Sequence, residues 1–411
     1  MKKKYFVPML SLVIFVFALG LTRHLAIPVD NEPNEEATYI EENLLVNKDD
    51  EHLETELEDK ETLAKAKLLA VGDLMFHMPQ NRAAYDNGEN TYDYAPFFKH
   101  VKPYIENADI AIGNFETVTR ADREYSGFPR FNTPKETLSA IGDAGFDILS
   151  TANNHCLDQG KKGIIDTIDS IHQYSMINIG TYKNRDDNQI LVKEINNIKI
   201  GFLSYTYGLN GLDSLLTEEE LSYMINLIDE GRIKLDIENA REIGTDLVVV
   251  SIHWGNEYQR KAHVSQIDLG EKIIDWGGDI VLGSHPHVIQ GSQIVERDGK
   301  EKFIIYSLGN FISNQRQDTM GNSYTEDGLM VEIEIEKDLI KSETAIKDIH
   351  FIPTWVYKYR EGNKVNYEIL PIEDILEENS STYTSIIRRL EKSYEDTIEK
   401  VTENSLYSEL N

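Results

Sequence analysis

The sequence predicts an α/β fold with mixed sheets, and two observations lead to this prediction. Apolar segments of strand length, most of them ending in polar residues, alternate along the chain with segments of helical periodicity. Such alternation is typical of sheets that helices cover on both sides. Residues 190–206 and 351–372 each look like an antiparallel hairpin, which indicates mixed rather than wholly parallel sheets. With 40% hydrophobic residues, the 411-residue chain can bury a sizeable core.

Composition excludes some classes of function. The formal net charge of -30 argues against nucleic-acid binding, because phosphate backbones are bound by fields of Lys and Arg. The simplest consequence of this charge is solubility. Cys156 is the only cysteine in the sequence, so the chain forms no intrachain disulfide and no cysteine-based metal site.

The first 27 residues predict a signal anchor that crosses a membrane once. Lysines follow Met1, and residues 5–22 form a charge-free apolar run of about 18 residues, the length of a transmembrane helix. Basic residues stay on the cytoplasmic side, so the rest of the chain is expected outside the cytoplasm, at the cell membrane. Because no A-x-A-like site directly follows the run, we favour an uncleaved anchor (residues 1–27) over a cleaved signal peptide.

Composition divides the remaining chain into three parts. Residues 28–66 are acidic and poor in aromatic residues, which is typical of a flexible linker. Residues 67–372 contain the predicted strands and hairpins and are expected to form the folded domain. Residues 373–411 read as a highly charged helical tail, for which the simplest interpretation is a solvated helix on the surface.

The first half of the domain is expected to alternate strands with helices. The predicted order is a strand at 67–73, a helix around 96–106, a strand at 108–116, a helix around 134–145 and a strand at 147–151. The last of these strands stops at a polar tip, residues 153–155. An amphipathic helix then starts after Gly160.

The second half begins with the hairpin of residues 190–206, whose turn is Asn196-Asn197. It continues with a long helix over roughly 217–243, apolar strands at 246–253, 279–284 and 303–307, an alternating strand at 328–336 and the hairpin of 351–372. Each of the three apolar strands leads into a polar tip, as the strands of the first half do.

Polar side chains stand at these strand ends, where open α/β sheets place their chemistry. They are Asp73, Asn114, Glu116, Asn154, His155, His253, His285 and His287. Because strand ends of a wound sheet can converge on one edge, we expect these side chains to form one site. Carboxylate, amide and imidazole groups are ligands suited to two adjacent divalent cations with open positions for water.

Some of these residues also fit a structural role. Asp73, which follows Gly72, fits a cap of the next segment, and His253 fits a satisfied histidine on an apolar strand. The pair of histidines around Pro286 is the sharper signal, because proline fixes the backbone between two imidazoles that can reach neighbouring metals.

His155 is either a ligand or an acid. Asn154 is the better ligand by position, which leaves His155 free to shuttle a proton, and Asp158 can orient its ring. Further candidates for supporting contacts or substrate binding are His77, Asn114, Glu257 and Asn310, and some of these fit a solvated position equally well.

The motifs that carry these residues resemble those of the bacterial capsule-synthesis CapA family, the poly-gamma-glutamate synthesis proteins, which are related to calcineurin-like metallophosphoesterases. The resembling segments are VGDLMF, GNFET, FDILSTANNHCLDQGKKGI, SIHWGNEY, GSHPHVIQG and YSLGNF, in family order from Val71 to Phe311. The resemblance implies a four-layer α/β/β/α sandwich of the metallophosphoesterase type, with the site on one edge. It also implies two divalent cations, of manganese, iron, zinc or magnesium.

The resemblance assigns roles to individual residues. Asp73 matches the first metal aspartate, Asn154 the metal asparagine and His155 the proton donor. The later histidine ligands are matched by His253, His285 and His287.

Two positions depart from the phosphoesterase pattern. Met75 stands where the D-x-H motif has its histidine, and the region of the bridging aspartate reads Asn114-Phe115-Glu116. The bridge is therefore either Glu116 or absent. Members of the CapA family share these departures, which bear on phosphoesterase activity and on full occupancy by two metals, and not on the fold.

The function that the resemblance implies is a membrane-anchored, extracytoplasmic role in poly-gamma-glutamate (capsule) biosynthesis or export in a Gram-positive envelope, with a metal-dependent hydrolase-type site. The implied partners are polyglutamate synthase and export membrane proteins, with the anionic glutamyl polymer as a substrate. Two alternatives stay open. One is a non-catalytic accessory subunit of the synthase and export complex, and the other is a general metallophosphoesterase.

Overall fold

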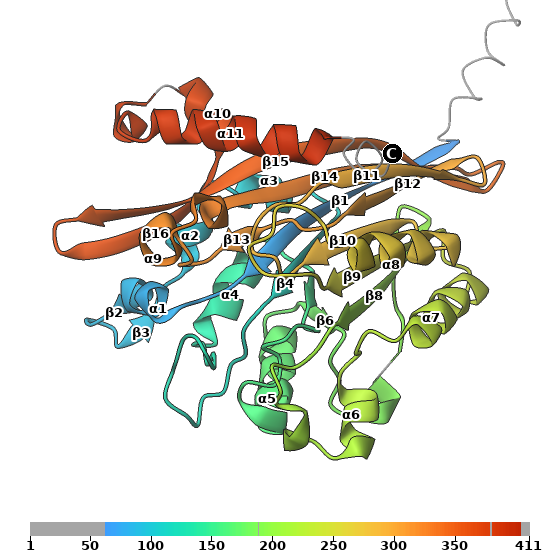
Figure 1. Ribbon diagram of the computed structural model, residues 1–411, viewed down its shortest axis with the longest axis horizontal. Helices are drawn as coiled ribbons and strands as arrows, with labels where there is room; N and C mark the ends of the chain where they lie inside the picture. Colours follow the sequence, from blue (N-terminus) through green and yellow to red (C-terminus); the bar gives the residue numbers. More distant parts are fainter. Residues whose placement is uncertain (1–61, 188, 379, 404–411) are drawn as a thin grey trace, which may run out of the picture. The chain divides into compact units, whose positions relative to one another are not determined.

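The computed structural model describes residues 62–187, 189–378 and 380–403 (Figure 1). The expected anchor (residues 1–27) and all but the end of the expected linker (28–66) lie outside these residues. Within the described part of the chain, every helix is too short or too polar to cross a membrane. Strand β1 (Leu63–Leu74) begins inside the range expected to be linker, because Leu63 to Val71 pair with the long strand β14.

The larger of two main sheets carries the first half of the domain and its C-terminal strands. Its order is β16-β15-β14-β1-β4-β5-β6, with β13 beside the end of β1. The bounds are β4 (Ile110–Phe115), β5 (Ile148–Ser150), β6 (Ile177–Ile179), β13 (Asn310–Ile312), β14 (Asp327–Asp338), β15 (Glu343–Glu361) and β16 (Lys364–Pro371). Strands β1, β4, β5 and β6 are parallel, whereas β14, β15 and β16 are antiparallel, so the sheet is mixed.

The smaller main sheet has the order β11-β12-β10-β9-β8-β7. Its strands are β7 (Leu191–Ile195), β8 (Ile198–Thr206), β9 (Leu247–His253), β10 (Ile280–Ser284), β11 (Ser292–Arg297) and β12 (Lys300–Ile305). Strands β8, β9, β10 and β12 are parallel, and antiparallel strands close both edges. The expected hairpin of β7 and β8 is present, and Asn196 and Asn197 have the positive φ that its two-residue turn requires.

The two sheets pack face to face through an apolar core. Leu68 and Ile112 of the larger sheet and Val249 and Phe303 of the smaller one belong to this core, and none is more than 1% exposed. Such continuous Val, Ile and Leu runs suit strands that are buried on both faces. The packing places the carboxyl ends of β1, β4, β9 and β10 near one another.

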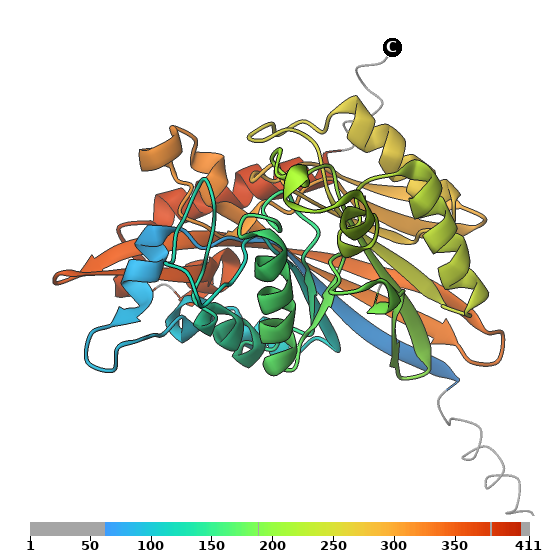
Figure 2. The ribbon, with the colours of Figure 1, turned by 90° about the horizontal axis from the view of Figure 1, so that it is seen from below.

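Helices cover the outer face of each main sheet, as Figures 1 and 2 show. On the larger sheet these are α2 (Ala95–Phe98), α3 (Lys102–Glu106), α4 (Glu136–Asp143) and α5 (Gly160–Gln173), and on the smaller one α7 (Glu230–Glu242) and α8 (Val264–Asp275). The remaining short elements are α1 (Met78–Ala84), β2 (Tyr85–Asp86), β3 (Thr91–Tyr92), α6 (Glu218–Met224) and α9 (Gln317–Met320). The prediction of a mixed α/β fold is confirmed.

The prediction of one long helix over residues 217–243 is wrong, since the structure has two helices there, α6 and α7. The intervening backbone is extended because Asn226 pairs with two strand ends: its N–H donates to Gly180 O and its carbonyl accepts from Thr206 N. Thr217 and Asp229 cap the two helices through their side chains.

The C-terminal tail differs from the solvated helix that the sequence predicts. Helices α10 (Ile372–Glu378) and α11 (Ile387–Thr402) pack on the larger sheet, and α11 contacts β14 and β15 (Figure 1). Leu390 and Val401 on α11 are at most 1% exposed. The charged residues of α11 therefore occupy one face only, and the other face extends the core.

Candidate metal centre

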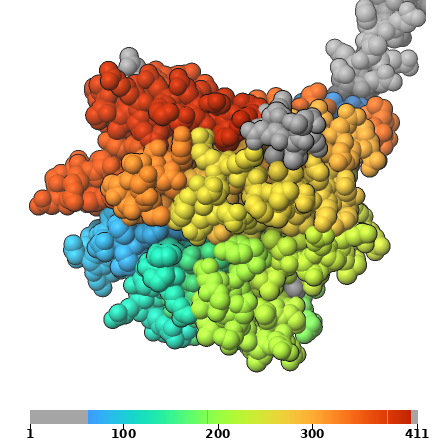
Figure 3. Space-filling model, in the orientation of Figure 1, coloured from blue at the N-terminus to red at the C-terminus, as the bar shows by residue number. Residues whose placement is uncertain are grey.

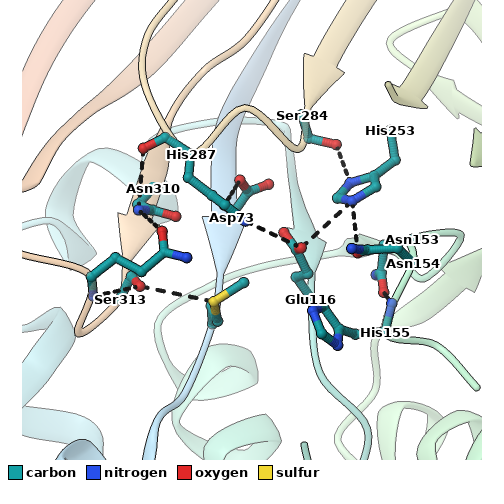
Figure 4. A network of polar contacts seen from close by, with 12 residues as sticks. Asp73, Glu116, Asn153, Asn154, His155, His253, Ser284, His287, Asn310 and Ser313 are labelled. Atoms are coloured by element: carbon teal, nitrogen blue, oxygen red, sulfur yellow. Dashed lines mark hydrogen bonds and ion pairs between the residues drawn. The ribbon is translucent and has the colours of Figure 1, made fainter. Parts of the chain in front are cut away.

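The strand ends converge as the sequence predicts (Figure 4). The parallel register places Asp73, on β1, opposite Asn114, on β4, and Ser284, on β10, opposite His253, on β9. Glu116 lies just beyond β4. Since the two sheets face each other, these four strands bring carboxylates and imidazoles together from distant parts of the sequence.

Glu116 lies at the middle of the cluster. Its side chain is fully buried, and Oε1 lies 3.5 Å from His253 Nε2 and 3.7 Å from His287 Nε2. Two groups of donor atoms form around it, Asp73-Glu116-His287 and Glu116-His253-His285, and within each group all three atoms lie within 4.8 Å of one another. Because both groups contain Glu116, this carboxylate is common to the two candidate groups.

The first donor group is fixed by hydrogen bonds. Asp73 Oδ2 lies 3.0 Å from His287 Nδ1, and Asp73 Oδ1 accepts from Asn114 Nδ2 at 2.8 Å. The same amide lies 3.4 Å from Glu116 Oε2, so Asn114 holds both carboxylates through its N–H groups. We conclude that Asn114 positions ligands and does not offer its oxygen to this group.

The second donor group is fixed from two sides. His253 Nδ1 lies 2.9 Å from Ser284 Oγ, and His253 Nε2 lies 3.0 Å from Asn154 Oδ1. The His285 ring is 4.8 Å from the His253 ring, between centroids. Asn154 thus presents its oxygen beside the second donor group.

The electrostatics of the cluster suit a cation. Burial, together with the charge of Asp73, raises the pKa of Glu116 well above its usual range. Burial and the neighbouring histidines lower the pKa of His253 well below its usual value and that of His285 to about 3. Neutral imidazole is the form that binds metal, and a dication would favour the ionised carboxylate that burial disfavours.

Two buried atoms of the cluster lack a hydrogen-bond partner in the described part of the chain: Glu116 Oε1 and His285 Nδ1. Buried polar atoms normally have partners, so these two call for an explanation. Ligation of divalent cations provides one, since one atom is a carboxylate oxygen and the other an imidazole nitrogen. The residues present therefore fit the divalent metals that the resemblance implies.

The loop of His285 and His287 is conformationally strained. Their φ values are 97° and 56°, in a region that non-glycine residues rarely adopt. The loop is held by Tyr258 N, which donates to Pro286 O at 2.8 Å, and by Asn310 Nδ2, which donates to His287 O at 3.3 Å. The strain turns both imidazoles toward the cluster, one into each donor group.

His155 is held by Asp158. Its Nδ1 lies 2.8 Å from Asp158 Oδ2, which also accepts from Phe131 N at 2.7 Å. The Phe131 ring packs edge-on against the imidazole, with centroids 4.8 Å apart. These contacts fix the orientation of His155 near Glu116 and leave Nε2 available for proton transfer (Figure 4).

The remaining candidates lie at the border of the cluster. His77 precedes α1, and its Nδ1 accepts from Asn314 N at 3.3 Å. Burial and nearby His287 lower its pKa to about 4, yet His77 belongs to neither donor group among the described residues. Glu257 is exposed and forms a third group of donor atoms with His285 and His287, at the solvent side.

Asn310 and Met75 take structural positions. Asn310 Nδ2 donates to three oxygens, of His287, Gln315 and Thr325, so its N–H groups hold loops in place. Met75 is buried and accepts a weak hydrogen bond from Ser313 Oγ at 3.9 Å. The position where the phosphoesterase pattern has histidine therefore carries a buried thioether.

Two neighbours of the cluster, Ser284 and Tyr207, were not predicted from the sequence, and a third, Asn153, was placed in the polar tip of residues 153–155 without a role of its own. Asn153 Nδ2 donates to Phe115 O at 2.9 Å. The Tyr207 ring is 47% exposed and packs 4.6 Å from the His285 ring, between centroids. Tyr207 directly follows β8. A search for tyrosines, as well as carboxylates, amides and histidines, at the ends of predicted strands would therefore have identified it.

Two packed mixed sheets with a carboxylate and imidazole cluster at their strand ends define an α/β protein with a candidate metal centre. Solved structures of similar fold include the calcineurin-like phosphoesterase YfkN from Bacillus subtilis, at 13% identity, 82% coverage of this chain, 98% coverage of that chain and a TM-score of 0.42. A phosphatase from Mycoplasma pneumoniae matches at 14% identity, with 71% of this chain and 94% of that chain covered and a TM-score of 0.41.

The chain belongs to the bacterial capsule synthesis protein family PGA_cap, whose model matches residues 67–315. Its relatives include the capsule biosynthesis protein CapA of Bacillus anthracis, 30% identical over 294 residues, which are 69% of this chain and 66% of that protein. The chain thus spans just under two thirds of that relative. The PGA biosynthesis protein CapA of Bacillus subtilis (strain 168) is 25% identical over 327 residues, with 73% of this chain and 81% of that protein covered.

Proposed function

We propose that the chain is a membrane-anchored, extracytoplasmic protein of poly-gamma-glutamate capsule synthesis or export, with a metal-dependent hydrolase-type site of the metallophosphoesterase kind. Family membership supports the capsule pathway. The observation that carries the hydrolase-type site is Glu116, a buried carboxylate shared by two donor groups. Polyglutamate synthase and export proteins of the membrane are the proposed partners.

In this proposal Asp73, Glu116 and His287 would hold one divalent cation, and Glu116, His253 and His285 would hold a second, with Asn154 beside it. Two such ions supply Lewis-acid polarisation of the reacting oxygen and an activated water near neutral pH. His155 Nε2 gives a proton to the leaving group, since Asp158 fixes the opposite ring nitrogen. Glu257, at the solvent side, is placed to contact an entering substrate or a ligand water.

The test combines metal content with polymer output. The purified full-length chain is analysed for bound metal by elemental analysis, as wild type and as the double variant Asp73→Asn, His287→Ala. We expect tightly bound metal in the wild type and loss of most of it in the double variant. In cells that depend on this chain for capsule, His287→Ala should abolish polymer, whereas His172→Ala, which removes an exposed imidazole on α5, should not. Normal polymer output from His287→Ala would refute the proposal.

A second candidate function is a non-catalytic accessory subunit, and Met75 is the observation that favours it. One ligand of the phosphoesterase pattern is replaced by a buried thioether, which lowers the donor count of the first site. This candidate predicts that Asp73→Asn and His285→Ala leave polymer output unchanged, while removal of residues 1–22 abolishes it. A general phosphoesterase is disfavoured by the same replacement, and turnover of simple phosphoesters by the purified protein would revive it.

A further inference from the structure

A basic groove of about 780 Å³ lies between helix α1 and the hairpin of β15 and β16. Its charged lining consists of Arg82, Lys358, Arg360, Lys364 and a single acidic residue, Asp86. This ratio reverses that of the whole sequence, which has 71 Asp and Glu against 41 Lys and Arg. Figure 3 shows the hairpin, in orange-red, projecting directly beside the blue α1 segment.

The positive charge of the groove is largely uncompensated. Arg82, Arg360 and Lys364 are exposed, and no carboxylate in the described part of the chain forms an ion pair with any of them. The Asp86 carboxylate is engaged by its own turn, where Oδ1 accepts from Gly88 N at 2.7 Å. Uncompensated cations on a strongly acidic protein create a local field that attracts anions.

Hydrogen bonds lead from the groove toward the candidate metal centre. Lys358 Nζ donates to Asn314 Oδ1 at 3.2 Å, and Asn314 N donates to His77 Nδ1 at 3.3 Å. His77 directly precedes α1 and lies close enough to His287 to sense its charge. Two contacts therefore connect the lining of the groove to His77, at the border of the cluster.

We propose that this groove binds a polycarboxylate chain and holds it on the approach to the donor groups. The identity of that chain as a glutamyl polymer rests on the proposed function. Arg binds carboxylates in bidentate fashion, and a flexible polymer can engage several cations at once, so weak single contacts add up. The acidic remainder of the surface repels such a polymer, which directs binding to the groove.

The test measures polymer binding by the purified full-length chain. A fluorescently labelled poly-gamma-glutamate oligomer is titrated with wild type and with the groove variant Arg82→Gln, Arg360→Gln, Lys364→Gln, in buffer of fixed ionic strength. The matched control is Lys300→Gln, Lys347→Gln, Arg388→Gln, which removes the same charge from exposed positions outside the groove. We expect binding about tenfold weaker in the groove variant, since three exposed ion pairs each contribute a few-fold, and little change in the control.

Equal weakening in both triple variants would overturn the inference, because binding would then follow net charge alone. Wild-type binding to polyphosphate or to anionic lipid vesicles, without binding to polyglutamate, would overturn it as well. Metal content measured on the same preparations separates this inference from the proposed function. If the wild type holds metal, but the groove variant and the control variant both bind polymer as tightly as the wild type, only the inference about the groove is refuted. If polymer binding is weakened in the groove variant alone, but the wild type holds no metal, the inference about the groove is supported and the proposed catalytic site is refuted.

Discussion

Glu116 is the side chain on which both donor groups depend. We expect Glu116→Gln, which keeps the shape but removes the charge, to weaken binding of both cations at least about tenfold, a loss that even outer contacts of metal sites can cause. The free energy of unfolding of the metal-free protein should not fall, because a buried carboxyl with a raised pKa contributes little to stability. Elemental analysis and denaturant titration after chelation measure the two effects. Glu257→Gln, on an exposed side chain, is the control, and two retained metals in Glu116→Gln would contradict the bridging position.

Asp158 acts on His155 and touches neither donor group. Asp158→Asn should lower polymer output or turnover about 10- to 100-fold while metal content stays at the wild-type level, because the negative charge that it removes faces His155 and neither donor group. An asparagine oxygen still accepts from Phe131 N, so the fold is preserved. A loss of metal in this variant would show that Asp158 supports the metal centre directly.

The sequence could predict which residues lie together at the site, but not the role of each residue within it. Strand ends converge because parallel register is set by apolar pattern, so Asp73, His253 and His287 could be placed on one edge in advance. Whether Glu116 is shared by the two donor groups depends on how closely the two sheets pack, to within a few ångströms. The strands of these sheets come from distant parts of the sequence, so sequence patterns do not give this spacing. The same holds for Asn114, whose amide holds two carboxylates by N–H groups, a role that residue type alone does not reveal.

At the scale of elements, α11 fixes the segment that supports the site. Arg389 Nη2 lies 2.5 Å from Asp327 Oδ1 at the start of β14, and Ser393 Oγ donates to the same oxygen at 2.7 Å. Thr325 lies two residues before Asp327, and its carbonyl oxygen accepts a hydrogen bond from the side chain of Asn310. The same Asn310 amide also donates to the carbonyl oxygen of His287. Asp327 is 3% exposed, so its charge depends on α11.

Removal of the Arg389 charge should therefore destabilise the fold. We expect Arg389→Met to lower the free energy of unfolding by about 3 kcal/mol, since it leaves a buried carboxylate without its cation. Arg388→Met, on the exposed neighbour, should change it by less than about 0.5 kcal/mol. Adding Asp327→Asn to Arg389→Met should recover part of the loss. Denaturant titration checks all three variants, and equal stability of Arg388→Met and Arg389→Met would contradict the role of α11.

The elements that sequence patterns missed share a physical cause. On α11 the buried face includes Ser393 and Thr397, so the stripe looks polar although it packs on the sheet. The break between α6 and α7 comes from the pairing of Asn226 with strand ends, which local periodicity does not register. Helix α8 has a different status, because its apolar residues already stand at helical spacing in the sequence.

At the scale of the whole molecule, the N-terminal prediction decides where the folded unit described within residues 62–403 works. If residues 1–27 are an uncleaved anchor, the protein should sediment with membranes and resist extraction by alkaline carbonate, because a span of about 18 apolar residues is held by the bilayer core. Mass spectrometry should find an intact N-terminal segment, and protease added to protoplasts should digest the folded unit. Deleting residues 1–27 should leave that unit in the cytoplasm and abolish polymer output. A mature N-terminus downstream of residue 27 would instead establish a cleaved signal peptide, and protection from external protease would place the site on the cytoplasmic side.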